Sequence, residues 1–357
     1  MGDLFEKIKT KKLSFKADEL PKQIRGKYTL PCLTSSFQNQ GLNYFVPRDG
    51  ATILKNVISI PSNSDIYRAY FQSNEFTVLS DAYAIQWIFN GLKLSPNQYL
   101  FTVQCINKVT DLSIYSYKNK LGGWNVVKNK YIQLPIKNNK IDFEFMESFI
   151  AKIEAERMKK LEDYLSASGL KNYALTNEEK QVLKDFEILK FEDFNVIDIF
   201  DVKNSRNILS RDIIAGSGKI PYLCASSENN SVSSYISYDE KHLDKGNCVF
   251  IGGKTFVVTY QEKDFYSNDS HNLILSLKDE EKKNKLTQLF LSSCINKSLG
   301  HKYSWGDSIS NRKIQKDIVL LPRKNQQPNY ELMETLISAI QKMVIKDVVL
   351  YVDEKRK

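Results

Sequence analysis

The sequence is poor in the residues that build disulfide frameworks and metal centres. It holds five cysteines and three histidines in 357 residues. The cysteines are scattered without a Cys-x-x-Cys pair, and no histidine has ligand spacing to a cysteine or to another histidine. An odd number of scattered cysteines fits reduced thiols in a cytoplasm. We therefore expect neither a secreted disulfide-stapled fold nor a metal site.

Long apolar runs are also missing. No stretch approaches the roughly 20 apolar residues that a membrane helix needs, and the first 21 residues have neither the apolar core nor the cleavage site of a signal peptide. A content of 42% hydrophobic and 26% charged residues is typical of a soluble globular protein, and the length suggests two domains. The expected location is cytoplasmic, with no membrane partner.

Catalytic motifs are absent too. "AGSGKIPY" (215–222) resembles a phosphate-binding loop, but Ile213 and Ile220 stand where that motif needs Gly and Ser or Thr. The chain has no Asn/Asp-Pro-Pro-aromatic methylation motif and no Gly-x-Ser-x-Gly. "DEKHLDK" (239–245) offers fragments of a nuclease motif, but in a predicted polar loop. We predict no catalytic residues and no cofactor in this chain.

The chain does carry a net charge of +9 and a pI near 9.0. Such a balance favours a polyanionic partner, most simply nucleic acid. A Lys-rich solvated surface would give the same numbers, so charge alone leaves both interpretations open.

The strongest positive signal is an internal repeat. "LPIKNNKIDFEFMESFI" (134–150) is matched by "LPRKNQQPNYELMETLI" (321–337), 187 positions later. "CINK" occurs at 105 and 294, "NVISI" at 56 is matched by "NCVFI" at 247, and "SDAY" at 80 by "NDSH" at 268. The doublets Ser35-Ser36 and Ser226-Ser227 lie 191 apart. Matches in one order with slowly shrinking offsets predict two duplicated domains.

Each half reads as β-rich, followed by helix. The runs "NVISIP" and "NCVFIGGKTFVVTYQ" predict strands, and short helices are expected at 96–108 and 284–297. "NKYIQLPI" and "QKDIVLLPR" predict strands that end at Pro135 and Pro322, because proline cannot donate to a ladder. Asp142 and Asn329 then suit the N-caps of two amphipathic helices. Thr176 and Glu179 predict a capping box for a further helical piece.

These patterns predict an α+β protein with pseudo-twofold symmetry. Its expected parts are a first β-rich domain, 1–142, a helical spacer, 143–190, a second β-rich domain, 191–328, and a C-terminal helix, 329–357. The two long helices can pack antiparallel as a coiled coil and space the domains. Alternatively, each simply covers the core of its own domain. The candidate helix-interface residues are Phe145, Met146, Phe149, Ile153, Leu332, Met333, Leu336 and Ile340.

Polar and basic loop residues are the candidates for DNA contact. Hydroxyls and amides grouped on a loop contact phosphates and base edges, and basic side chains interleaved with aromatics suit a phosphate backbone. Ordinary turns and solvated basic loops are the plainer interpretation. The candidates are Ser35, Ser36, Gln38, Asn39, Lys118, Lys128, Lys130, Ser226, Ser227, Asn229, Asn230, Lys254, His271, Lys302, Tyr303, Arg312 and Lys313.

The ordered features resemble a known family. "IFDVKNSRNIL", an Ile-Pro-Tyr followed by Ser-Ser and Asn-Asn, and the segment "LLPRKNQQPNYELMETLI" before a helix are similar to the specificity subunit of bacterial type I restriction-modification enzymes. The connector "LEDYLSASGLKNYALTNEEKQVL" is similar to that of the BcgI-like branch. The first serine loop lacks counterparts of Tyr222 and Glu228, so we expect the two half-sites to differ.

The resemblance implies two target-recognition domains that read a split, asymmetric sequence in double-stranded DNA. It implies that helices over Phe143–Leu165 and Tyr330–Tyr351 form a coiled coil that docks methyltransferase subunits. Adenine methylation with S-adenosylmethionine, and cleavage by a restriction subunit, would belong to those partners. Two alternatives stay open: a restriction enzyme with a cryptic catalytic site, and a phage or plasmid decoy that binds the partner subunits without DNA.

Overall fold

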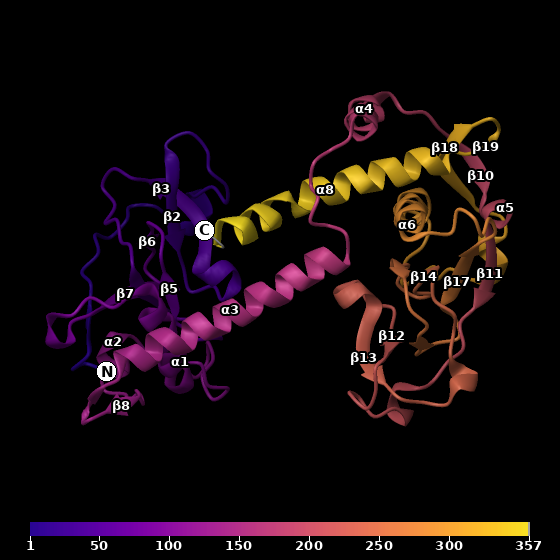
Figure 1. Cartoon of the computed structure of the whole chain (residues 1–357). Coiled ribbons are helices and arrows are strands. Elements are labelled where there is room, and N and C mark those ends of the chain that lie inside the picture. Colours follow the sequence, from indigo (N-terminus) through magenta and orange to yellow (C-terminus); the bar gives the residue numbers. More distant parts are fainter. Residues whose placement is uncertain (356–357) are drawn as a thin grey trace. The chain divides into compact units, whose positions relative to one another are not determined.

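The computed structural model describes residues 1–355, which divide into two compact units, Met1–Leu161 and the chain from Glu162 onward. Each unit is α+β, with a β-rich part that leads into one long helix (Figure 1). This confirms the predicted fold class. The unit boundary lies inside the predicted 143–190 spacer; the finer four-part division stays a prediction.

Unit 1 contains an antiparallel four-stranded sheet and a mixed three-stranded sheet. One sheet has the order β1-β7-β4-β5 and the other the order β3-β2-β6. Their strands are β1 (Phe5–Lys7), β2 (Tyr28–Leu33), β3 (Leu42–Pro47), β4 (Val57–Pro61), β5 (Tyr70–Gln72), β6 (Thr77–Val78) and β7 (Ala82–Trp87). The rest of the unit comprises α1 (Pro96–Thr110), α2 (Trp124–Val127), the hairpin β8 (Ile136–Lys137) and β9 (Lys140–Ile141), and α3 (Phe143–Ala167).

Unit 2 repeats this topology strand for strand. Its sheets have the orders β11-β17-β14-β15 and β13-β12-β16. The strands are β11 (Phe200–Asn204), β12 (Ile220–Leu223), β13 (Val232–Ile236), β14 (Cys248–Ile251), β15 (Val258–Gln261), β16 (Tyr266–Ser267) and β17 (Leu273–Leu277). After them come α6 (Lys285–Leu299), α7 (Asn311–Ile314), β18 (Ile318–Lys324), β19 (Gln327–Pro328) and α8 (Tyr330–Lys355). The duplication predicted from the sequence is therefore confirmed.

Unit 2 also has elements without a counterpart in the described part of unit 1. They are α4 (Asn177–Asp185), β10 (Phe191–Asn195) and α5 (Val196–Ile199). The predicted capping box of α4 is present, with Thr176 and Glu179 exchanging side-chain and backbone hydrogen bonds. β10 pairs antiparallel with β18 and so joins the hairpin that precedes α8.

Local sequence accounts for the entry into both long helices. The turns of the two preceding hairpins hold Asn138 and Asn139 at φ 51° and 60°, and Asn325 and Gln326 at φ 51° and 64°. Two successive left-handed residues make the tight turn that suits the twist of a hairpin. The predicted caps follow: Asp142 accepts from the Phe145 amide at 2.9 Å and Asn329 from the Leu332 amide at 3.2 Å.

The two strands that were predicted to end at Pro135 and Pro322 are both wrong: the first does not form, and the second continues past its proline. Residues 131–135 form no strand, and β8 begins only after Pro135. β18 runs through Pro322 to Lys324. Pro322 is tolerated because it faces Phe191, the first residue of β10, at the end of that ladder. The missing strand in unit 1 reflects a missing partner, since no strand within residues 1–355 pairs with 131–135.

Each unit has its own hydrophobic core between its larger sheet and its 15-residue helix, α1 or α6. Met333 and Leu336 of α8 belong to the core of unit 2, at 0% and 2% exposure. The first turns of α8 thus cover their own unit, as the plainer alternative predicted. Met146 is also fully buried, whereas Phe145, Phe149 and Ile340 are exposed. Leu332 and Ile153 are half-buried.

Candidate nucleic-acid interface

The two serine loops have the same backbone. In unit 1 the Thr34 amide donates to the Gly41 carbonyl at 2.9 Å, and in unit 2 the Cys224 amide donates to the Ser231 carbonyl at 2.9 Å. The tips hold Asn39 at φ 46° and Asn229 at φ 47°, each followed by a second left-handed residue. This conformation favours asparagine among residues with a side chain. Both tips are exposed to solvent.

Hydrogen bonds correct the alignment of these loops by one residue. Ser36 Oγ accepts from the Gln38 amide and Ser226 Oγ from the Glu228 amide, both at 3.1 Å. The two serines are thus counterparts, 190 positions apart. The Ser-Ser doublets do not superimpose at 191 as predicted: Ser35 corresponds to Ala225, and Ser227 corresponds to Phe37. The alignment predicted from the sequence followed the identical Ser-Ser doublets, whereas the hydrogen bonds of the turns show that the two loops correspond at an offset of 190.

The two tips also use their amides differently. Asn229 Nδ2 donates to the Val232 carbonyl at 2.9 Å, and Asn230 Nδ2 to the Tyr260 carbonyl at 3.0 Å. Both amides therefore support their own loop. The side chains of Gln38 and Asn39 form no hydrogen bond within residues 1–355. The free amides of the unit 1 loop remain available to an outside partner.

Two glutamines that the sequence reasoning missed hold these tips in place. Gln72 Nε2 donates to the Gln40 carbonyl at 3.1 Å, and Gln261 Nε2 donates to the Asn230 carbonyl at 2.9 Å. They stand at the ends of β5 and β15, 189 positions apart. The sequence did contain a signal, because a glutamine recurs at the spacing of the two repeats. It was missed because the glutamine lies in a strand and not in the loop that it supports.

In unit 2 a second loop joins the serine loop. Thr255 Oγ1 donates to the Ala225 carbonyl at 2.9 Å. Next to it, Asp269 lies 2.9 Å from Lys254 Nζ and 2.7 Å from His271 Nδ1. Burial works against ionisation of Asp269, but the His271 amide and the Lys254 and His271 side chains outweigh it and lower the carboxyl pKa to about 2. Lys254 and His271 are thus held together, as exposed side chains, by a charged carboxylate.

The basic segment 300–317 completes this edge of unit 2. Lys313 Nζ contacts Asp307 at 2.5 Å and Lys302 Nζ contacts Asp317 at 3.2 Å, whereas Arg312 is exposed and forms no ion pair within the described chain. Tyr303 is 9% exposed. Burial raises the pKa of its phenol, and the bond from its hydroxyl to Asp317 raises it further. Tyr303 therefore has a structural position beneath the segment surface, where it bonds Asp317.

A chain of contacts makes these groups one continuous surface. Asn311 of α7 donates to the Asn204 side chain at 3.3 Å, and Asn204 donates to the Ser270 carbonyl at 2.7 Å. The rings of Phe256 and Tyr303 lie 5.3 Å apart, which joins segment 300–317 to the loop that carries Lys254. The structure thus brings the unit 2 candidates to one edge.

Unit 1 assembles its candidates in the same way. Ser64 Oγ donates to the Ser35 carbonyl at 2.8 Å, and the Tyr117 amide donates to Asp65 at 2.9 Å. The serine loop, the 61–69 loop and the 111–121 loop are therefore neighbours. Lys118 is exposed on the last of them without an ion pair in the described chain. Lys130 Nζ bonds the Tyr115 hydroxyl at 2.8 Å.

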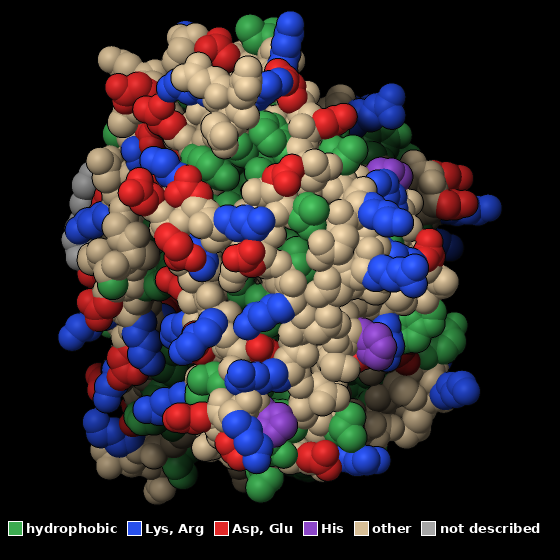
Figure 2. Space-filling view, turned by 90° about the vertical axis from the view of Figure 1, so that its right-hand side faces the viewer, with side chains coloured by type: hydrophobic (Ala, Val, Ile, Leu, Met, Phe, Trp, Pro, Cys, Tyr) green, Lys and Arg blue, Asp and Glu red, His purple; other side chains and the backbone are tan. Residues whose placement is uncertain are grey.

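Two further cations of unit 1 have side chains open to solvent. Lys128 is exposed, and its carbonyl accepts from the Gly2 amide at 2.7 Å. Arg68, which sequence reasoning missed, pairs with Asp111 at 2.7 Å and is half exposed. Figure 2 shows a face of the molecule from the side of unit 2: Lys and Arg side chains are interspersed with Asp and Glu around an area of other side chains and backbone. Such a surface can add uncharged polar contacts to its cationic ones.

Metal-ligand clusters and reactive thiols are the two kinds of catalytic group most easily recognised from side-chain placement. Within residues 1–355, no group of three or more His, Cys, Asp or Glu side chains could hold a metal ion. Burial raises the pKa of the Cys32, Cys248 and Cys294 thiols to about 12 in each case, which keeps them protonated and unreactive. The same part of the chain contains no helix long and apolar enough to cross a membrane.

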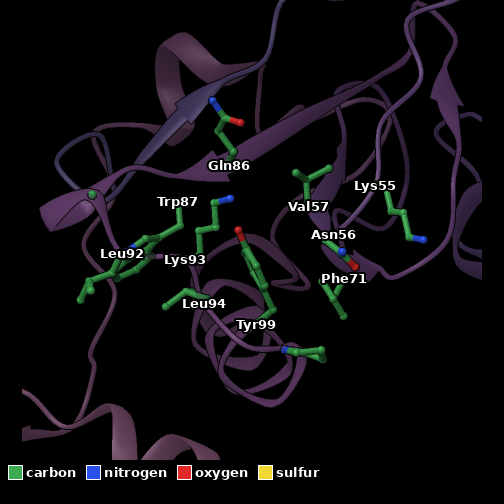
Figure 3. A pocket seen from close by; sticks show the side chains of 12 residues that line it. Lys55, Asn56, Val57, Phe71, Gln86, Trp87, Leu92, Lys93, Leu94 and Tyr99 are labelled. Carbon is green, nitrogen blue, oxygen red and sulfur yellow. The ribbon is translucent and has the colours of Figure 1, made fainter.

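Unit 1 contains a cleft of about 530 Å³ (Figure 3). Lys55 and Lys93 enter it from different loops, and the stacked rings of Phe71 and Tyr99, 5.0 Å apart, form part of its wall. None of its twelve lining residues is Asp, Glu, His or Cys. In unit 2 the counterpart of Tyr99, at an offset of 189, is Gln288, whose side-chain amide donates to Asn247. The titratable groups among its lining residues are the two lysines and Tyr99, with no carboxylate or imidazole beside them.

Comparison with known proteins agrees with this geometry. The family model "Type I restriction modification DNA specificity domain" matches residues 1–163 and again 189–350. The "Type II restriction enzyme BgcI specificity subunit" of Heyndrickxia coagulans is 26% identical over 258 residues, which cover 71% of this chain and 70% of that protein. The crystal structure of the type I restriction-modification S subunit of M. genitalium superimposes with a TM-score of 0.61 at 11% identity, covering 99% of this chain and 90% of that one. The last match shows the fold.

Proposed function

We propose a mechanism of target reading from the premise that this chain belongs to the type I restriction-modification DNA specificity family. The chain is a DNA specificity subunit, and subunits of this family are not catalytic. Each unit reads one half of a bipartite, asymmetric target in double-stranded DNA through the loop edge described above. One observation carries this proposal: the same loop skeleton is built twice, with different side chains at its tip.

The skeleton is repeated by the same bonds, whereas the exposed groups differ. The tip of unit 1 presents Phe37, Gln38 and Asn39, and the corresponding tip of unit 2 presents Ser227, Glu228 and Asn229. Amides read adenine and carboxylates accept from the cytosine amino group in the major groove. A fixed frame with different readers suits two different half-sites. The basic residues beside each tip would hold the phosphates and set the register.

Catalysis then belongs to partner subunits. Helices α3 and α8 would dock methyltransferase subunits, and those subunits would bind S-adenosylmethionine and methylate the DNA. A restriction subunit could join the same assembly. Because its substrate is cellular DNA, the complex would act in the cytoplasm. The absence of a metal group within residues 1–355 is compatible with this division of labour.

Exchange of the loop tips tests the proposal. The chain is expressed with its methyltransferase partner, and methylome sequencing reports the modified target. Replacement of residues 37–39 by Ser-Glu-Asn should change one half of the target and leave the other half and the spacing unchanged. The matched control gives the hairpin turn before α3 the residues of the turn before α8. Only Asn139 changes, to Gln, and neither half of the target should change. Equal methylation of all sequences, or metal-dependent cutting by the isolated chain, would overturn the proposal.

A further inference from the structure

Unit 2 is completed by a helix and strand that cover one side of it. β10 forms a five-residue ladder with β18, from Phe191 opposite Pro322 to Asn195 opposite Ile318. The Phe191 ring stacks on Phe290, with ring centres 6.5 Å apart and planes 2° apart. Val182 and Leu183 of α4 and Phe194 of β10 pack against the core. Segment 177–195 therefore closes this face.

Unit 1 has a chain segment that corresponds to β18 but is paired with no strand within the described residues. The hairpins β8–β9 and β18–β19 correspond at an offset of 187, since Ile136 pairs with Ile141 and Arg323 pairs with Pro328. Residues 131–135 are thus the counterparts of 318–322. The Met1 nitrogen donates to the Lys130 carbonyl at 2.7 Å, just as the Val196 amide donates to the Asp317 carbonyl at 3.0 Å. The correspondence therefore holds up to the first residue of the open edge.

Side chains along that edge are correspondingly exposed. Tyr131 is 90% exposed and Ile136 is 71% exposed. Within the described chain, residues 131–135 belong to no sheet. An edge of unpaired peptide groups can accept a strand.

An aromatic cluster contains Phe101, the counterpart at an offset of 189 of the Phe290 that stacks on β10 in unit 2. The rings of Phe101, Phe145 and Phe149 lie 5.7–6.0 Å from one another. Phe145 and Phe149 are 45% and 43% exposed, whereas Leu336, the counterpart of Phe149, is 2% exposed beneath the α4–β10 side of unit 2. Clustered exposed aromatics of this kind mark interaction sites.

The chain's own segment is already engaged on unit 2. Glu179 of α4 is buried and accepts from Ser338 at 2.6 Å and from Lys342 at 2.8 Å, in addition to the five-residue ladder of β10. Because this copy of the segment is engaged on unit 2, it does not cover the corresponding edge of unit 1 as well. Lys128, Lys130, Lys137 and Lys140 flank the open edge. A strand as acidic and aromatic as "FEDFN" of β10 complements them.

We propose that unit 1 binds a partner protein by strand addition. A segment of the partner, an acidic aromatic strand preceded by an amphipathic helix, pairs with Tyr131–Pro135 and covers Phe101, Phe145 and Phe149. Main-chain bonds would supply affinity and the aromatic pocket specificity. The inference rests on the proposed function in one respect: α3, which carries Phe145 and Phe149, is there assigned to methyltransferase docking. It adds the position and the chemistry of the contact.

A peptide with the sequence of residues 177–195 serves as the probe, and fluorescence anisotropy measures its binding to the full-length chain. We expect saturable binding and slowed hydrogen exchange at the amides of 131–134. Phe149→Lys should weaken binding about tenfold or more, as loss of an aromatic anchor does. Ile24→Lys, at another exposed apolar residue of unit 1 that is 66% exposed, is the control and should bind normally. Phe145→Lys is the second variant should Phe149→Lys misfold.

The methyltransferase subunit is then added in place of the peptide. Slowed exchange at 131–134, reversed by excess peptide, supports a separate partner. A dimer of the chain alone that protects the same amides and dissociates in Phe149→Lys would instead make a second copy the occupant and overturn the proposal. Absence of peptide binding and of protection would also overturn it. The sequence preference of the same complex for DNA is measured in parallel. If the complex shows no sequence preference but still binds the peptide, the proposed reading mechanism fails and the docking surface stands.

Discussion

Replacement of Lys342 by methionine should destabilise unit 2 through the carboxylate that it leaves behind. The Glu179 side chain is 5% exposed and that of Lys342 is 18% exposed, with 2.8 Å between the charged atoms. Removal of one partner from a buried pair strands the other charge and costs about 3 kcal/mol of unfolding free energy. At 2–4 °C per kcal/mol for a unit of this size, the melting temperature should fall by roughly 6–12 °C.

Thermal unfolding followed by circular dichroism and by hydrogen exchange of β10 and β18 measures this effect. The matched control is Lys346→Met, one turn further along α8, where the lysine is exposed and without an ion pair in the described chain. The control should change stability by less than about 0.5 kcal/mol. The double variant with Glu179→Gln should recover part of the loss, because the stranded charge is gone. A Lys342→Met protein as stable as the control would refute the reasoning.

The same pair predicts a dependence on pH. Burial works against ionisation of Glu179, but bonds from Lys342, Ser338 and the Thr176 amide outweigh it and lower the carboxyl pKa below its ordinary value. A carboxyl whose pKa is lowered on folding stabilises the protein above its unfolded pKa of about 4.3 and loses that contribution as pH falls toward the folded value. The stability gap between wild type and Glu179→Gln should therefore be largest near neutral pH and shrink below about pH 4.5. A gap that is constant between neutral pH and pH 4 would contradict the assignment.

Two further predictions concern the DNA edge and the long helices. Arg312→Ala should lower the slope of log binding constant against log salt by about 0.9, one phosphate contact, with Lys346→Ala as the unaffected control; an unchanged slope in both removes Arg312 from the interface. Met333→Lys places a charge at a fully buried core position and should unfold unit 2, whereas Ile340→Glu, at 41% exposure, should leave it folded and weaken methyltransferase docking as measured by calorimetry. Normal docking of the Ile340→Glu protein would count against a role for this face of α8.

Local signals carried most of what the sequence predicted correctly. The caps at Asp142 and Asn329 and the capping box of Thr176 and Glu179 depend on residues three positions apart, and each forms its expected bonds. The repeat was visible for the same reason, because the hairpin and the helix start that follow Pro135 and Pro322 need similar residues at fixed spacing. Such features depend little on the rest of the fold.

The errors concern features that depend on segments far apart in the sequence, namely strand pairing and burial. Residues 131–134, Tyr-Ile-Gln-Leu, have strand propensity but no partner in the described chain, whereas the counterpart Ile-Val-Leu-Leu pairs with β10, more than 120 positions earlier in the sequence. Propensity cannot report whether a partner strand exists. Tyr303 was a candidate for DNA contact on composition, but its burial depends on Asp317 and Phe256, which the sequence does not place beside it. Which loop residues touch bases stays a prediction.

The attachment of each unit to its own long helix explains how loops could vary without disturbing the spacing of a bipartite target. Glu147 of α3 bonds Ser95 and Asn97 at the start of α1, and Glu334 of α8 bonds Asn284 and Thr287 at the start of α6. The corresponding carboxylate thus bonds the start of the corresponding helix in both units. Since α1 and α6 belong to the cores that carry the sheets, the orientation of each reading edge on its long helix is set by these contacts. Substitutions at the tips leave them intact, so a change of half-site sequence need not change the distance between half-sites.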